Sequence, residues 1–132
     1  MKHSRIAKSY VEVERQNLKD IEDPHLIILK LFDSLLNSIN NFIESSKNDE
    51  KMEFRSEQFS RALSIIYALQ SSLDFEKGGE IANNLFTLYE FSRQRLIEDF
   101  KNKTSEGAKQ SSEMLYEIRD AWIQIGKKNE QP

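Results

Sequence analysis

Two adjacent glycines, Gly78 and Gly79, separate two long stretches whose apolar residues recur at helical spacing. Glycine reaches positive φ without a steric penalty, so the pair is able to close one helix and let the chain reverse. Asp74 offers an acceptor for the free amides of such a junction, and Glu80 carries a negative charge that the first turn of a helix favours. Residues 72–89 therefore predict a helix–turn–helix corner. Asp74, Gly78 and Gly79 are its predicted turn residues, and the next helix is expected from about Glu80.

Two helical patterns precede this corner. Asp23-Pro24 predicts the start of the first, because aspartate is a good N-cap and proline fits the first helical position. Residues 26–43 carry a wide apolar stripe that faces a bundle interior, with members Ile28, Phe32, Leu35, Ile39 and Phe42. After the polar loop 45–50, a second stripe extends to about residues 73–75 and contains Phe59, Leu63, Ile66 and Leu73.

Two more helical patterns follow the corner, at about residues 80–101 and 108–125, and the break between them contains Gly107. Gly126 is expected to end the last helix, and residues 127–132 are expected to form a disordered tail. Because short connections make sequential helices antiparallel, residues 21–126 predict an all-α, antiparallel, up-down-up-down four-helix bundle.

The N-terminal residues 1–20 are polar with scattered apolar positions. The spacing of Ile6, Tyr10 and Val13 places them on one helical face, whereas Val11-Glu12-Val13 alternates as a strand would. We interpret the segment as a short mobile arm or cap helix on the bundle. A frayed terminus is the alternative.

Composition limits the function classes. The chain has 132 residues, which suits one domain, and a net charge of −3, which argues against a nucleic-acid partner. It has no cysteine, in keeping with a reducing compartment. The sequence shows no apolar run of the roughly eighteen residues that span a bilayer, and no apolar core of a secretory signal. We therefore expect a cytoplasmic protein without membrane insertion.

The residues that could support catalysis are few. His25 follows Glu22 at a spacing found in di-iron bundles, but such sites need two of these motifs, so a solvated histidine is expected instead of a metal ligand. Neither a nucleophilic triad nor a phosphate loop is indicated, because Lys77 precedes the glycine pair instead of following it. We expect no catalytic, cofactor-binding or metal-binding residue, and no enzyme.

Aromatic residues are more numerous than one narrow seam can hold. They include Tyr10, Tyr67, Phe75, Phe86, Tyr89, Phe91, Phe100, Tyr116 and Trp122. Most are expected in the core, where rings fill the layers of a bundle. An aromatic residue at the edge of the core, beside a second apolar seam, would form a groove for a helix or an unfolded segment.

The residues around the glycine pair are the most specific in the chain: Leu73-Asp74, Gly78-Gly79-Glu80-Ile81-Ala82, Asn84-Leu85 and Leu88-Tyr89. This pattern resembles the signature of the flagellin-specific secretion chaperones, the FliS family. Further similar positions cover most of the chain, namely Tyr10, Pro24-His25-Leu26-Ile27, Leu31-Phe32-Asp33, Ile65-Ile66, Leu69, Ser72, Leu115, Arg119, Ala121, Trp122 and Ile125. Phe32 departs from the family, which usually has tyrosine there, and so do the residues around Tyr10.

The resemblance implies a cytoplasmic all-α bundle that binds the disordered C-terminal segment of new flagellin. It further implies that the chaperone prevents premature polymerisation and delivers flagellin to the flagellar type III export gate. The client would wrap the bundle, and the N-terminal arm would cap part of the groove. The hypothesis for the site is that Ile6, Tyr10 and Val13 cover a groove lined by Tyr67, Leu85, Phe86 and Tyr89 until flagellin displaces them.

A second function class stays open. A structural or adaptor bundle could pair with itself as a homodimer, or with another partner helix, through the same exposed apolar seam. Binding of flagellin distinguishes the two classes, because an adaptor of this kind would ignore it.

Overall fold

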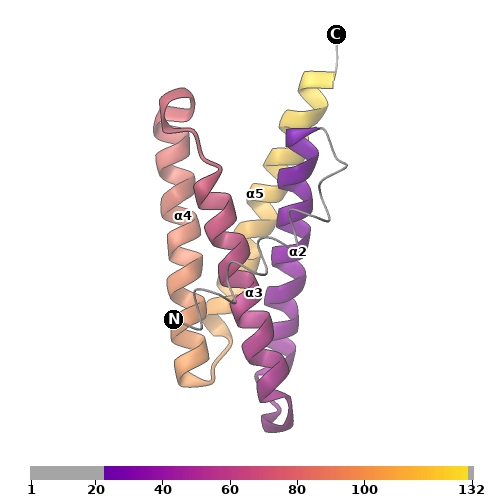
Figure 1. Cartoon of the computed structure of the whole chain (residues 1–132), viewed down its shortest axis with the longest axis vertical. Coiled ribbons are helices and arrows are strands. Elements are labelled where there is room, and N and C mark those ends of the chain that lie inside the picture. Colours follow the sequence, from indigo (N-terminus) through magenta and orange to yellow (C-terminus); the bar gives the residue numbers. More distant parts are fainter. Residues whose placement is uncertain (1–22, 131–132) are drawn as a thin grey trace.

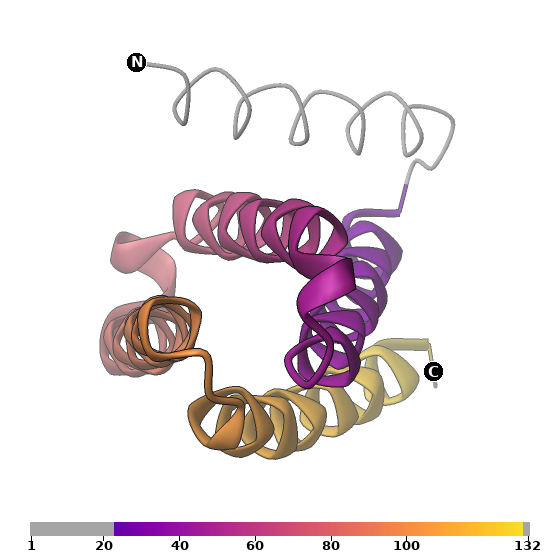
Figure 2. The same cartoon turned by 90° about the horizontal axis from the view of Figure 1, so that it is seen from below.

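The computed structural model describes residues 23–130, with side chains for residues 23–127. The helices are α2 (Pro24–Ser45), the 3-10 turn η1 (Asp49–Lys51), α3 (Met52–Ser71), α4 (Phe75–Asn102) and α5 (Glu106–Glu130). Figure 1 shows consecutive long helices running in opposite directions, and Figure 2 shows them arranged in a ring that α5 closes against α2. The predicted all-α four-helix bundle is confirmed. The predicted arm, residues 1–20, lies outside the described residues.

Helix α2 supplies the centre of the core. Its start is as predicted: the Asp23 side chain accepts a hydrogen bond from the His25 amide at 3.0 Å, and Pro24 takes the first helical position. The apolar stripe is buried, with Leu31, Phe32, Leu35, Leu36, Ile39 and Phe42 all at most 8% exposed. Ile65, Ile66 and Leu69 of α3, Leu96 of α4 and Leu115 of α5 complete this core.

By length and composition alone, α2 is long and apolar enough to cross a membrane. This corrects the expectation that no stretch of the chain would qualify. The core helix of a soluble protein passes the same test. Helix α2 fits that second account, because its apolar stripe packs against α3 and α5 within the bundle.

The reversal between α3 and α4 differs in detail from the prediction. Helix α4 begins at Phe75 rather than at about Glu80, because the Asp74 side chain accepts a hydrogen bond from the Lys77 amide at 3.0 Å and so starts the helix before the glycines. The glycine pair lies at the end of this first turn, where two helical segments of α4 meet. Gly79 lies inside α4 with φ 49° and ψ −123°, and there it kinks the helix.

The end of α5 also differs from the prediction. Gly126 was expected to terminate the helix, but α5 continues to Glu130, so the predicted disordered tail is helical as far as that residue. A Cβ atom at position 126 would overlap the ring of His25. Space for a neighbouring side chain, and not helix termination, therefore explains this glycine.

A buried polar cluster fixes the connection between α4 and α5. The Asp99 carboxylate accepts hydrogen bonds from the Thr104 hydroxyl and the Ala108 amide, both at 2.6 Å. The Arg55 guanidinium, on α3, donates to the Asp99 carbonyl at 2.8 Å and lies 4.2 Å from the centre of the Phe42 ring. Burial lowers the pKa of Arg55, against the opposing effect of Asp99. This end of the bundle is thus held closed.

Candidate functional site

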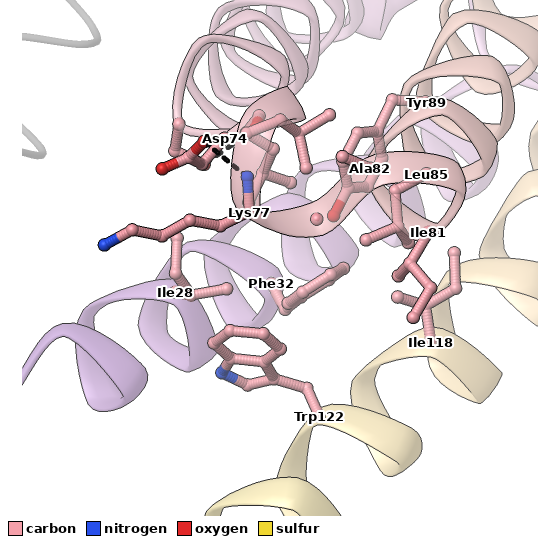
Figure 3. A pocket seen from close by; sticks show the side chains of 14 residues that line it. Ile28, Phe32, Asp74, Lys77, Ile81, Ala82, Leu85, Tyr89, Ile118 and Trp122 are labelled. Atoms are coloured by element: carbon pink, nitrogen blue, oxygen red, sulfur yellow. Dashed lines mark hydrogen bonds between the residues drawn. The ribbon is translucent and has the colours of Figure 1, made fainter.

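The opposite end of the bundle holds an apolar pocket. It lies where α2 and α4 begin and α3 ends, with one wall from the second half of α5, and its volume is about 360 Å³ (Figure 3). The walls include Ile28, Phe32, Leu69, Leu85, Ile118 and Trp122. This volume lies within the range of about 300–1,000 Å³ that is typical of ligand pockets.

Ile81 is the most exposed of the large apolar residues that line the pocket. It lines the pocket although its side chain is 71% exposed. It follows Gly79, whose positive φ redirects the first turns of α4, so the kink helps to set where Ile81 lies. This exposed side chain adds to the apolar lining of the pocket, and the two together offer a surface that a partner could bury.

Tyr89 lies deeper in the same wall. Its side chain is 3% exposed, and its ring centre lies 6.3 Å from that of Phe32. Burial raises the pKa of the Tyr89 hydroxyl to about 12. Figure 3 shows the hydroxyl oxygen pointing into the pocket, where it adds one polar group to an apolar lining.

The rim of the pocket is polar. Asp74 and Lys77 both border it and are both exposed. The Asp74 carboxylate is engaged with the Lys77 amide, as the dashed line in Figure 3 shows, whereas the Lys77 side chain extends outward. The site therefore combines an apolar interior with a cationic group at its edge.

Two of the predicted groove residues meet in this pocket. Leu85 and Tyr89 line it together. Phe86 is 40% exposed and contacts Phe75, with ring centres 6.1 Å apart, and it is not part of the pocket. Tyr67, on α3, is 66% exposed and also lies apart from it. The predicted cover residues, Ile6, Tyr10 and Val13, fall outside the described part of the chain.

The other walls of the pocket were not predicted to form a site. Ile28 and Phe32 were predicted in the apolar stripe of α2, and Trp122 was among the aromatic residues of which most were expected in the core; Ile118 lies one helical turn before Trp122 on α5. Their periodicity indicated the correct helix faces. The signal in the sequence that could have indicated the pocket was an excess of apolar side chains at one end of the bundle, near the glycine pair.

Helix α5 is held to α2 by three successive contacts. The side-chain amide of Asn40 donates a hydrogen bond to the Tyr116 hydroxyl at 3.4 Å, and the Arg119 guanidinium donates to the Asp33 carboxylate at 2.6 Å. At the pocket end, the rings of His25 and Trp122 stack with centres 4.5 Å apart. His25 is therefore half-buried against an aromatic ring, and the expectation of a solvated histidine is wrong.

Chemistry at a metal is not supported by the described side chains. Within residues 23–127, no group of three or more histidine, aspartate or glutamate side chains is placed to hold an ion. What this arrangement offers a partner is an apolar pocket with an exposed isoleucine at its entrance and a tyrosine hydroxyl within it.

Comparison with known proteins points to one family. The family model described as "Flagellar protein FliS" matches residues 6–129. The flagellar secretion chaperone FliS of Salmonella typhimurium is 33% identical over 125 residues, which cover 92% of this chain and 90% of that protein. That of Vibrio cholerae is 28% identical over 120 residues, covering 89% and 86%. FliSB of Pseudomonas aeruginosa, another flagellar secretion chaperone, is 28% identical over 115 residues, covering 87% and 90%. This chain belongs to the FliS family, which is a family of chaperones and not of enzymes.

Proposed function

We propose that this chain is a cytoplasmic flagellar export chaperone whose client is the disordered C-terminal segment of flagellin. Binding keeps flagellin from polymerising early, and the complex then passes to the flagellar type III export gate. The family and the names of the relatives support the chaperone class. The observation that carries the choice of site is the apolar pocket, open to solvent at Ile81.

The size of the pocket limits what it does in such a complex. A segment that folds on binding loses about 2–5 kcal/mol to ordering and typically buries about 1,000–3,000 Å². A pocket of about 360 Å³ takes a few apolar side chains and not a whole segment. It therefore acts as the anchor point of the client, and the rest of the segment lies along the outside of the bundle.

The N-terminal arm is proposed as a competitor for this pocket. The described chain begins at Asp23, and the carbonyl of His25 accepts a hydrogen bond from the indole of Trp122, which lines the pocket. Residues 1–20 therefore precede a point next to the site. If Ile6, Tyr10 and Val13 cover the pocket, the apparent affinity for flagellin falls by the fraction of molecules in which it is open.

Calorimetry with flagellin from the same organism tests the proposed function. Full-length flagellin is expected to form a stoichiometric complex, and flagellin that lacks its C-terminal segment is expected to give no binding heat. Equal binding of both forms would show that the client segment has been wrongly assigned. No binding of either form would reject flagellin as the partner.

One observation favours the alternative function, an adaptor bundle that associates with itself. Phe75 and Phe86 form an exposed aromatic pair on α4, outside the pocket. A homodimer formed through this surface would increase in population with concentration. Sedimentation velocity over a range of concentrations, with and without flagellin, separates it from a chaperone, which forms a larger species only with its client.

A further inference from the structure

The stack between His25 and Trp122 lies directly behind one wall of the pocket. The two rings are nearly parallel, at 7°, with centres 4.5 Å apart. The indole N–H of Trp122 also donates to the His25 carbonyl at 2.8 Å. Trp122 lines the pocket, whereas His25 does not. His25 therefore contacts Trp122 at two points, the face of the indole ring and its N–H group.

Gly126 completes this arrangement. It lies one helical turn after Trp122 in α5, and a Cβ atom there would overlap the Nε2 atom of His25 and lie 2.6 Å from its Cδ2 atom. A glycine inside a helix is unfavourable relative to alanine. Its presence is explained if position 126 must stay empty for the imidazole ring.

The location of the stack gives it a consequence for binding. It is the contact nearest the pocket among the three successive links from α5 to α2, after those of Tyr116 and Arg119. Without it, the indole would lose the surface that fixes its ring face. The wall that Trp122 offers to a bound side chain would then no longer be held in one place.

We propose that His25 is a positioning residue of the pocket: its ring holds Trp122 in the pocket wall, and Gly126 leaves the space that this ring occupies. The effect on client binding rests on the proposed function. The effect on Trp122 itself does not, because it is a property of the free protein.

Three variants test the proposal, namely His25→Ala, Gly126→Ala and the double variant. His25→Ala removes the ring, and Gly126→Ala displaces it. Trp122 is the sole tryptophan of the chain, so its emission and its quenching by acrylamide report this one site. Calorimetry with a synthetic peptide of the flagellin C-terminal segment reports the affinity of the site.

We expect each single variant to change the Trp122 emission and to increase its quenching by acrylamide. Each should also weaken peptide binding by about threefold to tenfold, the range given by loss of one aromatic stack. The double variant should match His25→Ala in both measurements, because a methyl group at position 126 has no ring to displace once His25 is gone.

The opposite pattern would overturn the proposal. If Gly126 only lowers the stability of α5, Gly126→Ala should raise the thermal midpoint of unfolding equally with and without the His25 ring. It should then leave the Trp122 emission and the peptide affinity unchanged. If the wild-type protein does not bind the peptide, the proposed function fails. The fluorescence of the same variants still decides whether His25 and Gly126 position Trp122.

Discussion

Substitution of Ile81 by alanine separates client binding from stability. The side chain is 71% exposed, so its loss removes little from the folded core, and alanine is the better helix former. We expect the free energy of unfolding to change by less than about 0.5 kcal/mol. A client that covers the pocket would bury most of this side chain. At about 0.8 kcal/mol for each buried methylene, the variant loses about 1–2 kcal/mol of binding.

That loss corresponds to about a five- to thirtyfold increase in the Kd for the flagellin C-terminal peptide. Isothermal titration calorimetry measures it, and urea denaturation of the free protein checks the stability. Phe91→Ala is the matched control, because Phe91 lies on the same helix, is 39% exposed and does not line the pocket. Phe86→Ala tests the surface outside the pocket. Wild-type affinity of Ile81→Ala, together with weakened binding by Phe86→Ala, would refute the assignment of the pocket.

Three further predictions concern Tyr89, the α4–α5 connection and the arm. Burial raises the pKa of Tyr89 to about 12, so the contribution of its neutral hydroxyl to stability is complete below about pH 10 and is lost as the pH rises towards 12. Urea denaturation should therefore show a smaller loss of unfolding free energy between about pH 9 and 11 for Tyr89→Phe than for the wild type. Asp99→Ala removes two hydrogen bonds to the α4–α5 connection, so it should lower the free energy of unfolding by about 2–4 kcal/mol, measured by urea denaturation. Thr104→Val, which removes one of the two, is the milder control. A change below about 0.5 kcal/mol for Asp99→Ala would contradict this role of the carboxylate. Deletion of residues 1–18 should tighten peptide binding measured by calorimetry, whereas abolished binding would make the arm part of the site.

The bundle was predictable because its evidence is local. The stripe of α2 recurs at helical spacing, and Asp23-Pro24 is a helix start whose capping bond depends only on neighbouring residues. The glycines were harder, because one residue type serves several purposes. Gly79 indicates a positive φ but not whether the chain there turns or kinks. Gly126 looks like a helix end, and only the ring of His25, distant in sequence, explains it.

The pocket was less predictable, because it depends on how the helices diverge. Phe86 and Tyr89 are three residues apart on α4, and the hypothesis for the site placed both in one groove. The structure buries Tyr89 in the pocket and leaves Phe86 outside it. Arg55, at the opposite end of the bundle from the pocket, shows a second reason why side-chain positions are hard to predict from sequence. A charged residue on α3 is expected in solvent, but its long side chain reaches backbone carbonyls and an aromatic face at the closed end of the bundle.

Site-specific photo-crosslinking tests most directly whether the pocket holds the client. A photoreactive phenylalanine analogue replaces Ile81 in one protein and Phe91 in a control, each is mixed with full-length flagellin, and mass spectrometry locates the crosslinks. We predict crosslinks from position 81 to the C-terminal segment of flagellin and none from position 91. A complex that forms but crosslinks only from position 91, or from position 81 only to other parts of flagellin, would contradict the proposed site.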